Sequence, residues 1–380
     1  MKCISKDKFQ PTGKWKGALL LEVAKVVKRD KSIDIIRGIA IFFVLWGHCI
    51  QSIAGDEGFF SNWVIRLIYS FHMPLFMIIS GYLFHRTCQK DFLTVLKEKL
   101  IALGIPFIVW NGLLYLRKCL FALMNTHSFV FDFSEMATVL FSGLWFLKSL
   151  FIITILTYFV MRGCKRFRYI VCMVAWISLI ASSNVVGEHT ADLFPFFIMG
   201  FLLAEYKKLY EQIEKYQYAI YVLYIVMLIG MDNNCFVYVS GINPITSSFG
   251  FFKQMWFNVY RIVIGAAGGF AVIVLVKRTY TKWARSIERL FEALGQNTLQ
   301  IYVVQSLILE RVLSRIVNAV IPTGGMYAGL IIQNFLIAPT AALLYAVVIL
   351  LVVRGVKQVP TLSMVLFGDH ATLSSEQGSS

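Results

Sequence analysis

The first long apolar run of the chain reads Asp34-Ile-Ile-Arg37-Gly-Ile-Ala-Ile-Phe-Phe-Val-Leu-Trp-Gly-His48. Eleven positions separate Arg37 from His48, and no ionisable residue lies between them. In an α-helix, eleven residues return to within about 20° of the starting direction and rise about 16 Å. Arg37 and His48 therefore share one face of the predicted helix. Because an imidazole is costly to bury in hydrocarbon, His48 is a candidate functional residue.

The composition predicts a membrane protein. Of the 380 residues, 58% are hydrophobic and only 15% are charged, and the mean hydropathy is +0.69. Many uncharged runs approach the ~20 residues that a helix needs to cross a bilayer. The expected fold class is an all-α, polytopic membrane helical bundle of about ten transmembrane helices. Their expected positions are 34–53, 62–84, 101–124, 143–161, 168–185, 191–205, 216–231, 256–276, 294–318 and 327–353.

The Lys and Arg residues lie mainly in alternate connections, which indicates membrane topology rather than nucleic-acid binding, despite the net charge of +15. Nine of them precede Arg37, whereas connections 54–61, 125–142, 182–190 and 321–326 contain none. The positive-inside rule then places both termini in the cytoplasm. The seven cysteines show no CxxC pair and no metal-ligand spacing, so neither a metal site nor a disulfide framework is expected.

Three parts of the chain follow from these patterns. We expect residues 1–31 to be a basic cytoplasmic segment, in which residues 15–27 would suit an interfacial helix. Residues 32–355 are expected to form one transmembrane domain. Residues 356–380 are expected to be a polar and disordered cytoplasmic tail.

Two sets of cationic or titratable residues lie at different depths in the expected spans. The set in the outer half of the bilayer is His48, His72, Arg117 and Lys148. The set at the cytoplasmic rim is Arg37, Arg86, Lys97 and Lys99. Each of these residues also has a purely structural explanation. A buried histidine can hydrogen-bond a neighbouring helix, Arg117 can reach the membrane interface, the lysines can encode topology, and Trp145 can belong to an aromatic belt.

Four stretches of the sequence carry a family resemblance. They are Ser32-Ile-Asp34-Ile-Ile-Arg37-Gly-Ile-Ala with Gly47-His48; Phe71-His72-Met73-Pro74-Leu75-Phe76 with Ser80-Gly81-Tyr82-Leu83; Leu144-Trp145-Phe146-Leu147; and Leu294-Gly295-Gln296-Asn297-Thr298-Leu299-Gln300-Ile301-Tyr302. In this order they resemble the acyltransferase 3 family of integral-membrane O-acyltransferases. The resemblance spans about residues 32 to 350. Gln305 stands near the place where relatives often have a histidine.

The resemblance implies an enzyme that moves an acyl group, most often acetyl from cytosolic acetyl-CoA, to a carbohydrate hydroxyl. The chain looks most like the bacterial polysaccharide and fucose-type O-acetylases, which implies the plasma or inner membrane of a bacterium. The expected partners are acyl-CoA as a co-substrate, with no bound cofactor, a surface polysaccharide or lipid-linked glycan, and the bilayer itself. The acceptor sugar, the acyl group and the oligomeric state are left open.

Acyl transfer to a sugar hydroxyl needs a base, and we expect His48 to fill this role. The negative tetrahedral intermediate needs a cation, for which we expect Lys148, with Arg117 as the alternative. The residues expected to hold the CoA phosphates are Arg37, Lys97, Lys99 and Arg86. The residues expected at acceptor or structural positions are His72, Trp145, Ser80 and Tyr302. An acetyl-histidine intermediate is the alternative to direct transfer.

A membrane transporter is the competing class. A flippase of a glycan-lipid or of a small anionic substrate could use Arg37 and Lys148 to bind the anionic headgroup. Against it, the sequence shows no paired broken helices in two matching halves, which usually mark a carrier. A signalling or scaffold protein is a third class, and in such a protein changing His48 would have no chemical consequence.

Overall fold

A computed structural model of the chain describes residues 30–54, 59, 62–126, 132–163, 166–307 and 331–369. The chain divides into two units, Met1–Lys31 and Ser32–Ser380, and everything below concerns the second, apart from the first residue of α2. The interfacial helix expected at 15–27 lies outside the described residues. Every regular element in the described ranges is helical, which confirms the all-α expectation.

The first half of the chain contains α2 (Lys31–Ala54), α3 (Trp63–Thr87), α4 (Phe92–Lys99), the π-helical turn η2 (Leu100–Gly104), α5 (Ile105–Thr126), α6 (Phe133–Ser142), α7 (Trp145–Gly163), α8 (Arg168–Ala181) and α9 (Ser183–Val186). The second half contains α10 (Glu188–Glu205), α11 (Lys207–Lys215), α12 (Gln217–Ile229), η3 (Asn233–Cys235), α13 (Val237–Ser240), α14 (Phe251–Thr279), η4 (Tyr280–Lys282), α15 (Arg285–Gln296), a helical stretch at 298–307, η5 (Gln333–Ile337), α18 (Ala338–Val356) and α19 (Pro360–Phe367).

Five stretches of helix among the described residues are long and apolar enough to cross a membrane: Lys31–Ser52, Trp63–Thr87, Trp145–Gly163, Phe251–Lys282 and Gln333–Val356. Arg168–Ala181 and Gln217–Ile229 are shorter apolar helices. This supports the membrane class. The count of ten spans and the cytoplasmic position of both termini stay predictions.

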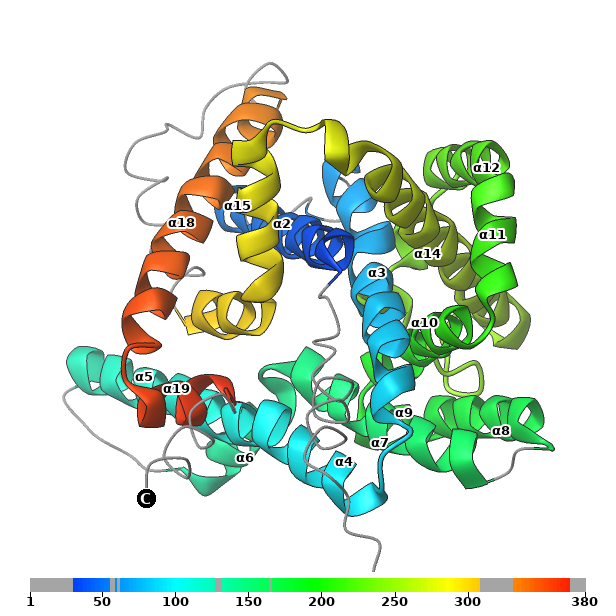
Figure 1. Cartoon of the computed structure of the whole chain (residues 1–380). Helices are drawn as coiled ribbons and strands as arrows, with labels where there is room; N and C mark the ends of the chain where they lie inside the picture. Colours follow the sequence, from blue (N-terminus) through cyan, green and yellow to red (C-terminus); the bar gives the residue numbers. More distant parts are fainter. Residues whose placement is uncertain are drawn as a thin grey trace, which may run out of the picture. The chain divides into compact units, whose positions relative to one another are not determined.

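Glycines let α10 and α14 pack closely on α3, which lies between α2 and these two helices (Figure 1). A side chain at Gly81 of α3 would overlap the carbonyl oxygen of Phe197, and one at Gly200 of α10 would overlap that of Ile78. On α14, a Cβ added at Gly265 would lie 2.8 Å from Cγ of Pro74. Small residues at these crossings allow backbones to approach, which is how helices associate in a membrane.

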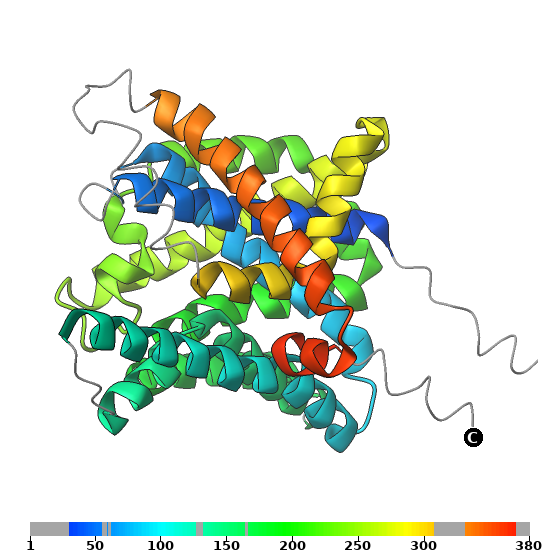
Figure 2. The same cartoon turned by 90° about the vertical axis from the view of Figure 1, so that its left-hand side faces the viewer.

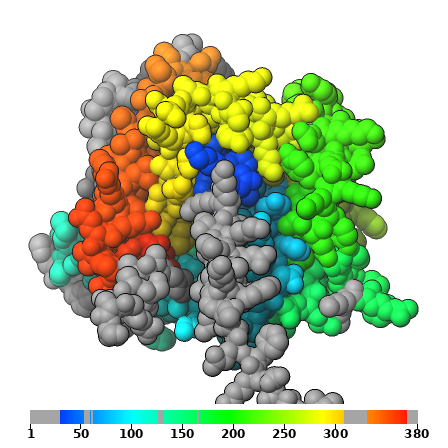
Figure 3. Space-filling view, in the orientation of Figure 1, coloured from blue at the N-terminus to red at the C-terminus, as the bar shows by residue number. Residues whose placement is uncertain are grey.

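Glycines also join α2 to α15. A side chain at Gly38 would overlap the carbonyl oxygen of Phe291, and one at Gly295 would overlap that of Asp34. In the space-filling view, α2 is visible at the surface beside α15 (Figure 3). The close crossing brings Arg37 to Thr298, and the guanidinium Nη2 donates a hydrogen bond of 2.6 Å to the Thr298 hydroxyl.

The expected span at 294–318 begins inside α15 rather than at the start of a new helix. α15 ends at Gln296, and the Asn297 side chain donates a hydrogen bond of 2.8 Å to the carbonyl of Ala293. A second helical stretch then runs from 298 to 307. The break is explained by the crossing with α2, because Gly295 must pack against the Asp34 backbone. Residues 308–318 lie outside the described ranges.

The prediction of a disordered tail is wrong for Pro360–Asp369. Pro360 stands in the first turn of α19, where its fixed φ suits a helix, and Gly368 ends the helix with a φ of +67°. The apolar side of α19 packs on α5: Phe367 is buried and stacks on Trp110, whose indole N–H donates a 2.7 Å hydrogen bond to the carbonyl of Leu366. Figure 2 shows α19 (red) lying against α5. Residues 370–380 lie outside the described ranges.

Candidate active site

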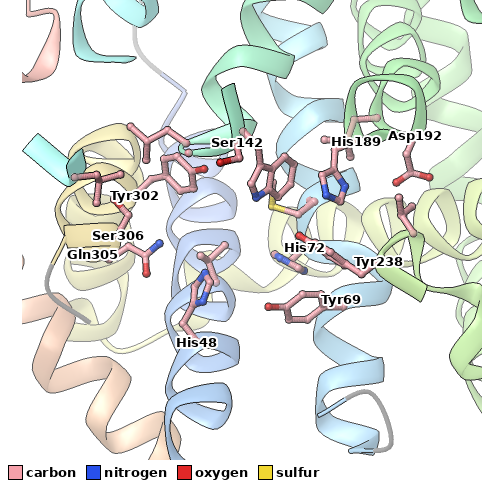
Figure 4. A pocket seen from close by; sticks show the side chains of 18 of the residues that line it. His48, Tyr69, His72, Ser142, His189, Asp192, Tyr238, Tyr302, Gln305 and Ser306 are labelled. Atoms are coloured by element: carbon pink, nitrogen blue, oxygen red, sulfur yellow. The ribbon is translucent and has the colours of Figure 1, made fainter. Parts of the chain in front are cut away.

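A cavity of about 860 Å³ is lined by residues of α2, α3, α5, α6, α7, α10 and α14, of the segment at 231–238 and of the helical stretch at 298–307. Figure 4 shows the side chains that line it. Five residues that the sequence singled out contribute to the lining: His48, His72, Arg117, Trp145 and Tyr302. These five residues lie on α2, α3, α5, α7 and the helical stretch at 298–307, which are far apart in the sequence. The packing of these helices brings the five side chains together.

His48 lies in the C-terminal half of α2, is half-buried and lines the cavity. The preceding residue, Gly47, explains how it gets there. A Cβ at Gly47 would lie 3.0 Å from the Tyr69 ring and 3.6 Å from the Ile68 side chain, so α2 approaches α3 closely at this level. The imidazole is therefore held at the wall between α2 and α3.

His72 is buried and has a defined hydrogen bond. Its Nδ1 lies 2.7 Å from the carbonyl oxygen of Ile68, one turn earlier on α3. Because a carbonyl oxygen only accepts, Nδ1 donates, and in the neutral ring Nε2 is left as an acceptor. The ring also packs edge-on against Tyr69, with centroids 4.9 Å apart.

Arg117 of α5 lines the cavity and is anchored to the helical stretch at 298–307. Its Nη1 donates hydrogen bonds of 2.5 Å to the carbonyl of Leu307 and 3.4 Å to that of Ser306. Gln305, the residue before Ser306, is buried and also lines the cavity.

Trp145 begins α7 after an unusual backbone turn. Leu144 has a φ of +33°, in the left-handed region that a branched side chain rarely adopts. Gly143, before it, has no room for a side chain because the Asn111 amide occupies that space. The turn points Trp145 at His189 of α10, with ring centroids 4.2 Å apart. Backbone strain of this kind is often found at functional sites.

Lys148, the expected cation for the intermediate, lies outside this lining. It is half-buried on α7, and its Nζ lies 3.6 Å from the position that a Cβ on Gly187 would take. It lines a separate hollow of about 460 Å³, together with Ser142, which borders both spaces. The structure thus places Arg117, and not Lys148, in one cavity with His48.

The four residues expected at the cytoplasmic rim, Arg37, Arg86, Lys97 and Lys99, do not line this cavity either. Arg37 contacts Thr298, as described above, while Arg86 and Lys97 are exposed and Lys99 lies over the Phe84 ring at 5.7 Å. Both lysines are on α4, whose first turn is capped by Asp91 through a 2.8 Å hydrogen bond from the Thr94 N–H; this bond lowers the pKa of the Asp91 carboxyl. Ser80 lies about two turns past His72 on α3, outside the lining.

Sequence reasoning missed five residues that line the cavity: Tyr69, His189, Asp192, Tyr238 and Arg261. Two of them carried a signal. Arg261 is the one charged residue in the expected span 256–276, and Asp192 lies just inside the span 191–205. The criterion that selected His48, an ionisable group within an apolar run, would have selected both.

Arg261 is buried and holds the segment that follows η3. Its Nε donates a hydrogen bond of 2.7 Å to the carbonyl of Cys235, and its Nη1 donates one of 2.8 Å to the carbonyl of Gly241. Its Nη2 also contacts the Ser240 hydroxyl. One turn earlier on α14, the side-chain amide of Asn258 donates a hydrogen bond of 2.8 Å to the carbonyl of Ile242. These bonds satisfy a buried cation and fix the backbone that carries α13 to the cavity.

Fold and site together define a helical membrane protein whose sequence motifs converge on one cavity. A family model described as an acyltransferase domain matches residues 30–354, and the chain therefore belongs to the acyltransferase 3 family. This confirms the resemblance read from the four stretches.

Two curated relatives are nodulation proteins NolL. The one from Sinorhizobium fredii is 30% identical over 191 residues, covering 47% of this chain and 49% of the relative. The one from Mesorhizobium japonicum is 31% identical over 184 residues, covering 47% and 48%. The chain thus spans about half the length of the curated relatives it matches. No solved structure matches the chain.

Proposed function

We propose that this protein transfers an acyl group, most simply acetyl, from cytosolic acyl-CoA to a hydroxyl of a surface or lipid-linked glycan. The observation that carries the proposal is the shared cavity. His48, His72, Trp145 and Tyr302 come from the four separate stretches of the family resemblance, and together with Arg117 they line one space of about 860 Å³. A volume of this size suits a small substrate or a sugar unit.

His48 is the general base in this proposal. Its neutral imidazole takes the proton of the sugar hydroxyl as the oxygen attacks the thioester carbonyl. The tetrahedral intermediate carries a negative oxygen, for which Arg117 supplies the positive charge because it shares the cavity with His48. Collapse of the intermediate breaks the carbon–sulfur bond, and the imidazolium returns its proton to the CoA thiolate. The products are an O-acyl sugar and free CoA.

The donor phosphates are assigned to the cytoplasmic set. Arg37 leads it, since its hydrogen bond to Thr298 fixes the guanidinium on the face of α2 that it shares with His48. Lys97 and Lys99 on α4, and Arg86 at the end of α3, supply further positive charge. The pantetheine arm would then bridge the ~16 Å of helix rise from Arg37 to His48.

Thioester consumption tests the proposal. The purified protein in detergent, with both faces accessible, is given acetyl-CoA and a panel of methyl glycosides of glucose, galactose, fucose and N-acetylglucosamine. Free CoA is measured with a thiol reagent, and the acetylated glycoside by mass spectrometry. We expect CoA release that requires a glycoside and matches the O-acetyl product in amount. A transporter would release no CoA with any of them, and that result overturns the proposal.

A further inference from the structure

One wall of the cavity, away from Arg117, is built from aromatic rings. Trp145 and His189 have ring centroids 4.2 Å apart, and His189 and Tyr238 have centroids 4.6 Å apart. Tyr238 is 53% exposed although it lines the cavity, so part of its ring is available to a ligand. Figure 4 shows His189, Asp192 and Tyr238 on one side of the cavity and Gln305 and Ser306 on the other.

Several polar groups on this lining have no hydrogen-bond partner among the described residues. They are the Asp192 carboxylate, the His189 ring nitrogens, the Tyr69 hydroxyl and the Gln305 amide. Polar groups that face a cavity need hydrogen-bond partners there, and a ligand or water supplies them. The carboxylate accepts, while the neutral imidazole, the amide and the phenol can both donate and accept. A molecule with several hydroxyl groups matches this set.

The wall is also held in place before any ligand arrives. Arg261 and Asn258 of α14 bond the backbone at Cys235, Gly241 and Ile242, on both sides of α13. Arg66 of α3 donates a hydrogen bond of 3.2 Å to the carbonyl of Met231, at the start of the connection between α12 and α13. A binding surface whose backbone is already ordered loses less entropy when the ligand binds.

We infer that His189, Asp192 and Tyr238 form the subsite that binds the acceptor sugar ring, and that this ring carries no carboxylate. The inference rests on the proposed function and states which residues bind the acceptor. The aromatic wall contacts the apolar C–H face of the ring, and Asp192 accepts hydrogen bonds from its hydroxyls. An acidic sugar would bring a second negative charge to Asp192, while the Nε and Nη1 donors of Arg261 are directed at backbone carbonyls and Asn258. A neutral or amino sugar is therefore favoured.

The test measures acceptor and donor kinetics separately in the detergent assay described above. Each glucose and galactose glycoside is paired with its uronate, methyl glucuronide or methyl galacturonide. For D192N and Y238A, we expect the KM of the best acceptor to rise about tenfold or more, as expected when a hydrogen bond to a charged group or an aromatic contact is lost. The KM for acetyl-CoA should stay unchanged. In D192N, the ratio of kcat/KM for the neutral glycoside to kcat/KM for its uronate should also be smaller than in the wild type.

Two matched controls separate this role from general damage. E188Q removes a carboxylate one turn earlier on α10, at a residue that does not line the cavity, and Y218A removes an exposed tyrosine of α12. Both should keep the wild-type acceptor KM. If wild type releases CoA with a glycoside, but D192N and Y238A keep its KM, the subsite is overturned while the acyltransferase stands. If wild type releases no CoA with any glycoside, the proposed function fails, and this inference fails with it.

Discussion

Among single residues, His48 is the one on which the proposed mechanism depends most directly. If it is the base, H48A should lower kcat for CoA release by about 10²–10⁴-fold, the usual contribution of a positioned base. Binding of acetyl-CoA should be unchanged, because the proposal assigns the donor phosphates to other residues. The measurement is the rate of CoA release at saturating acetyl-CoA and glycoside.

The matched control for His48 is H85A. His85 is a half-buried histidine on α3 that packs on Phe201 and does not line the cavity. It should keep the wild-type rate. An H48A protein that retains more than roughly a tenth of the wild-type rate would remove His48 from the role of base.

Variants of Arg37 can distinguish the contribution of its positive charge from that of its hydrogen-bond geometry. R37A should weaken acetyl-CoA binding by about 10- to 100-fold, as expected for the loss of a charge-assisted contact. R37K keeps the charge but loses the planar fork, so its loss should be smaller. T298V removes the hydroxyl that accepts from Arg37 but leaves the cation, and it should bind acetyl-CoA more tightly than R37A. Equal affinity in wild type, R37K and R37A would exclude Arg37 from the donor site.

At the scale of elements, the crossing of α3 and α10 depends on backbone contact. Gly200 lies against the carbonyl of Ile78, so G200A should lower the free energy of unfolding by about 1–3 kcal/mol or more through overpacking. G112A on α5 is the control, because nothing lies within 4 Å of its Cβ. There, alanine should raise stability slightly as the better helix former. Thermal unfolding in detergent measures both; a G200A protein as stable as G112A would contradict the close crossing.

The length and composition of each helix explain whether it could be predicted from the sequence. The long apolar runs predict α2, α3, α7, α14 and α18, since a span is recognised by length and lack of charge. The short helices within the connections, α4, α6, α11, α15 and α19, were not predicted. They are too short to be recognised as spans, and which of their residues are buried depends on a neighbouring element. For α19 the neighbour is α5, whose Trp110 bonds the Leu366 carbonyl.

At the scale of the whole molecule, the orientation in the membrane decides whether cytosolic acyl-CoA can be the donor. In intact cells, an impermeant thiol reagent should label cysteines in place of Val185 and Ile245, which are 84% and 79% exposed in connections predicted to face outward. It should not label cysteines in place of Gln89 or Lys207 until the cells are opened. The unaltered chain gives the background from its own cysteines. The reverse labelling pattern would place Arg37 and α4 outside and exclude a cytosolic donor.

The sequence by itself determined that the chain is a helical membrane protein of the acyltransferase 3 family, and it selected His48, His72, Arg117, Trp145 and Tyr302. These features are local: apolar length sets the class, and an ionisable residue in an apolar run stands out wherever its neighbours lie. Only the tertiary structure decided that Lys148 falls outside the cavity and that His189, Asp192, Tyr238 and Arg261 complete it. The physical reason is that these residues meet through glycine-mediated contacts between helices far apart in the chain, such as Gly81 with Phe197 and Gly200 with Ile78. No local pattern specifies which helices will meet.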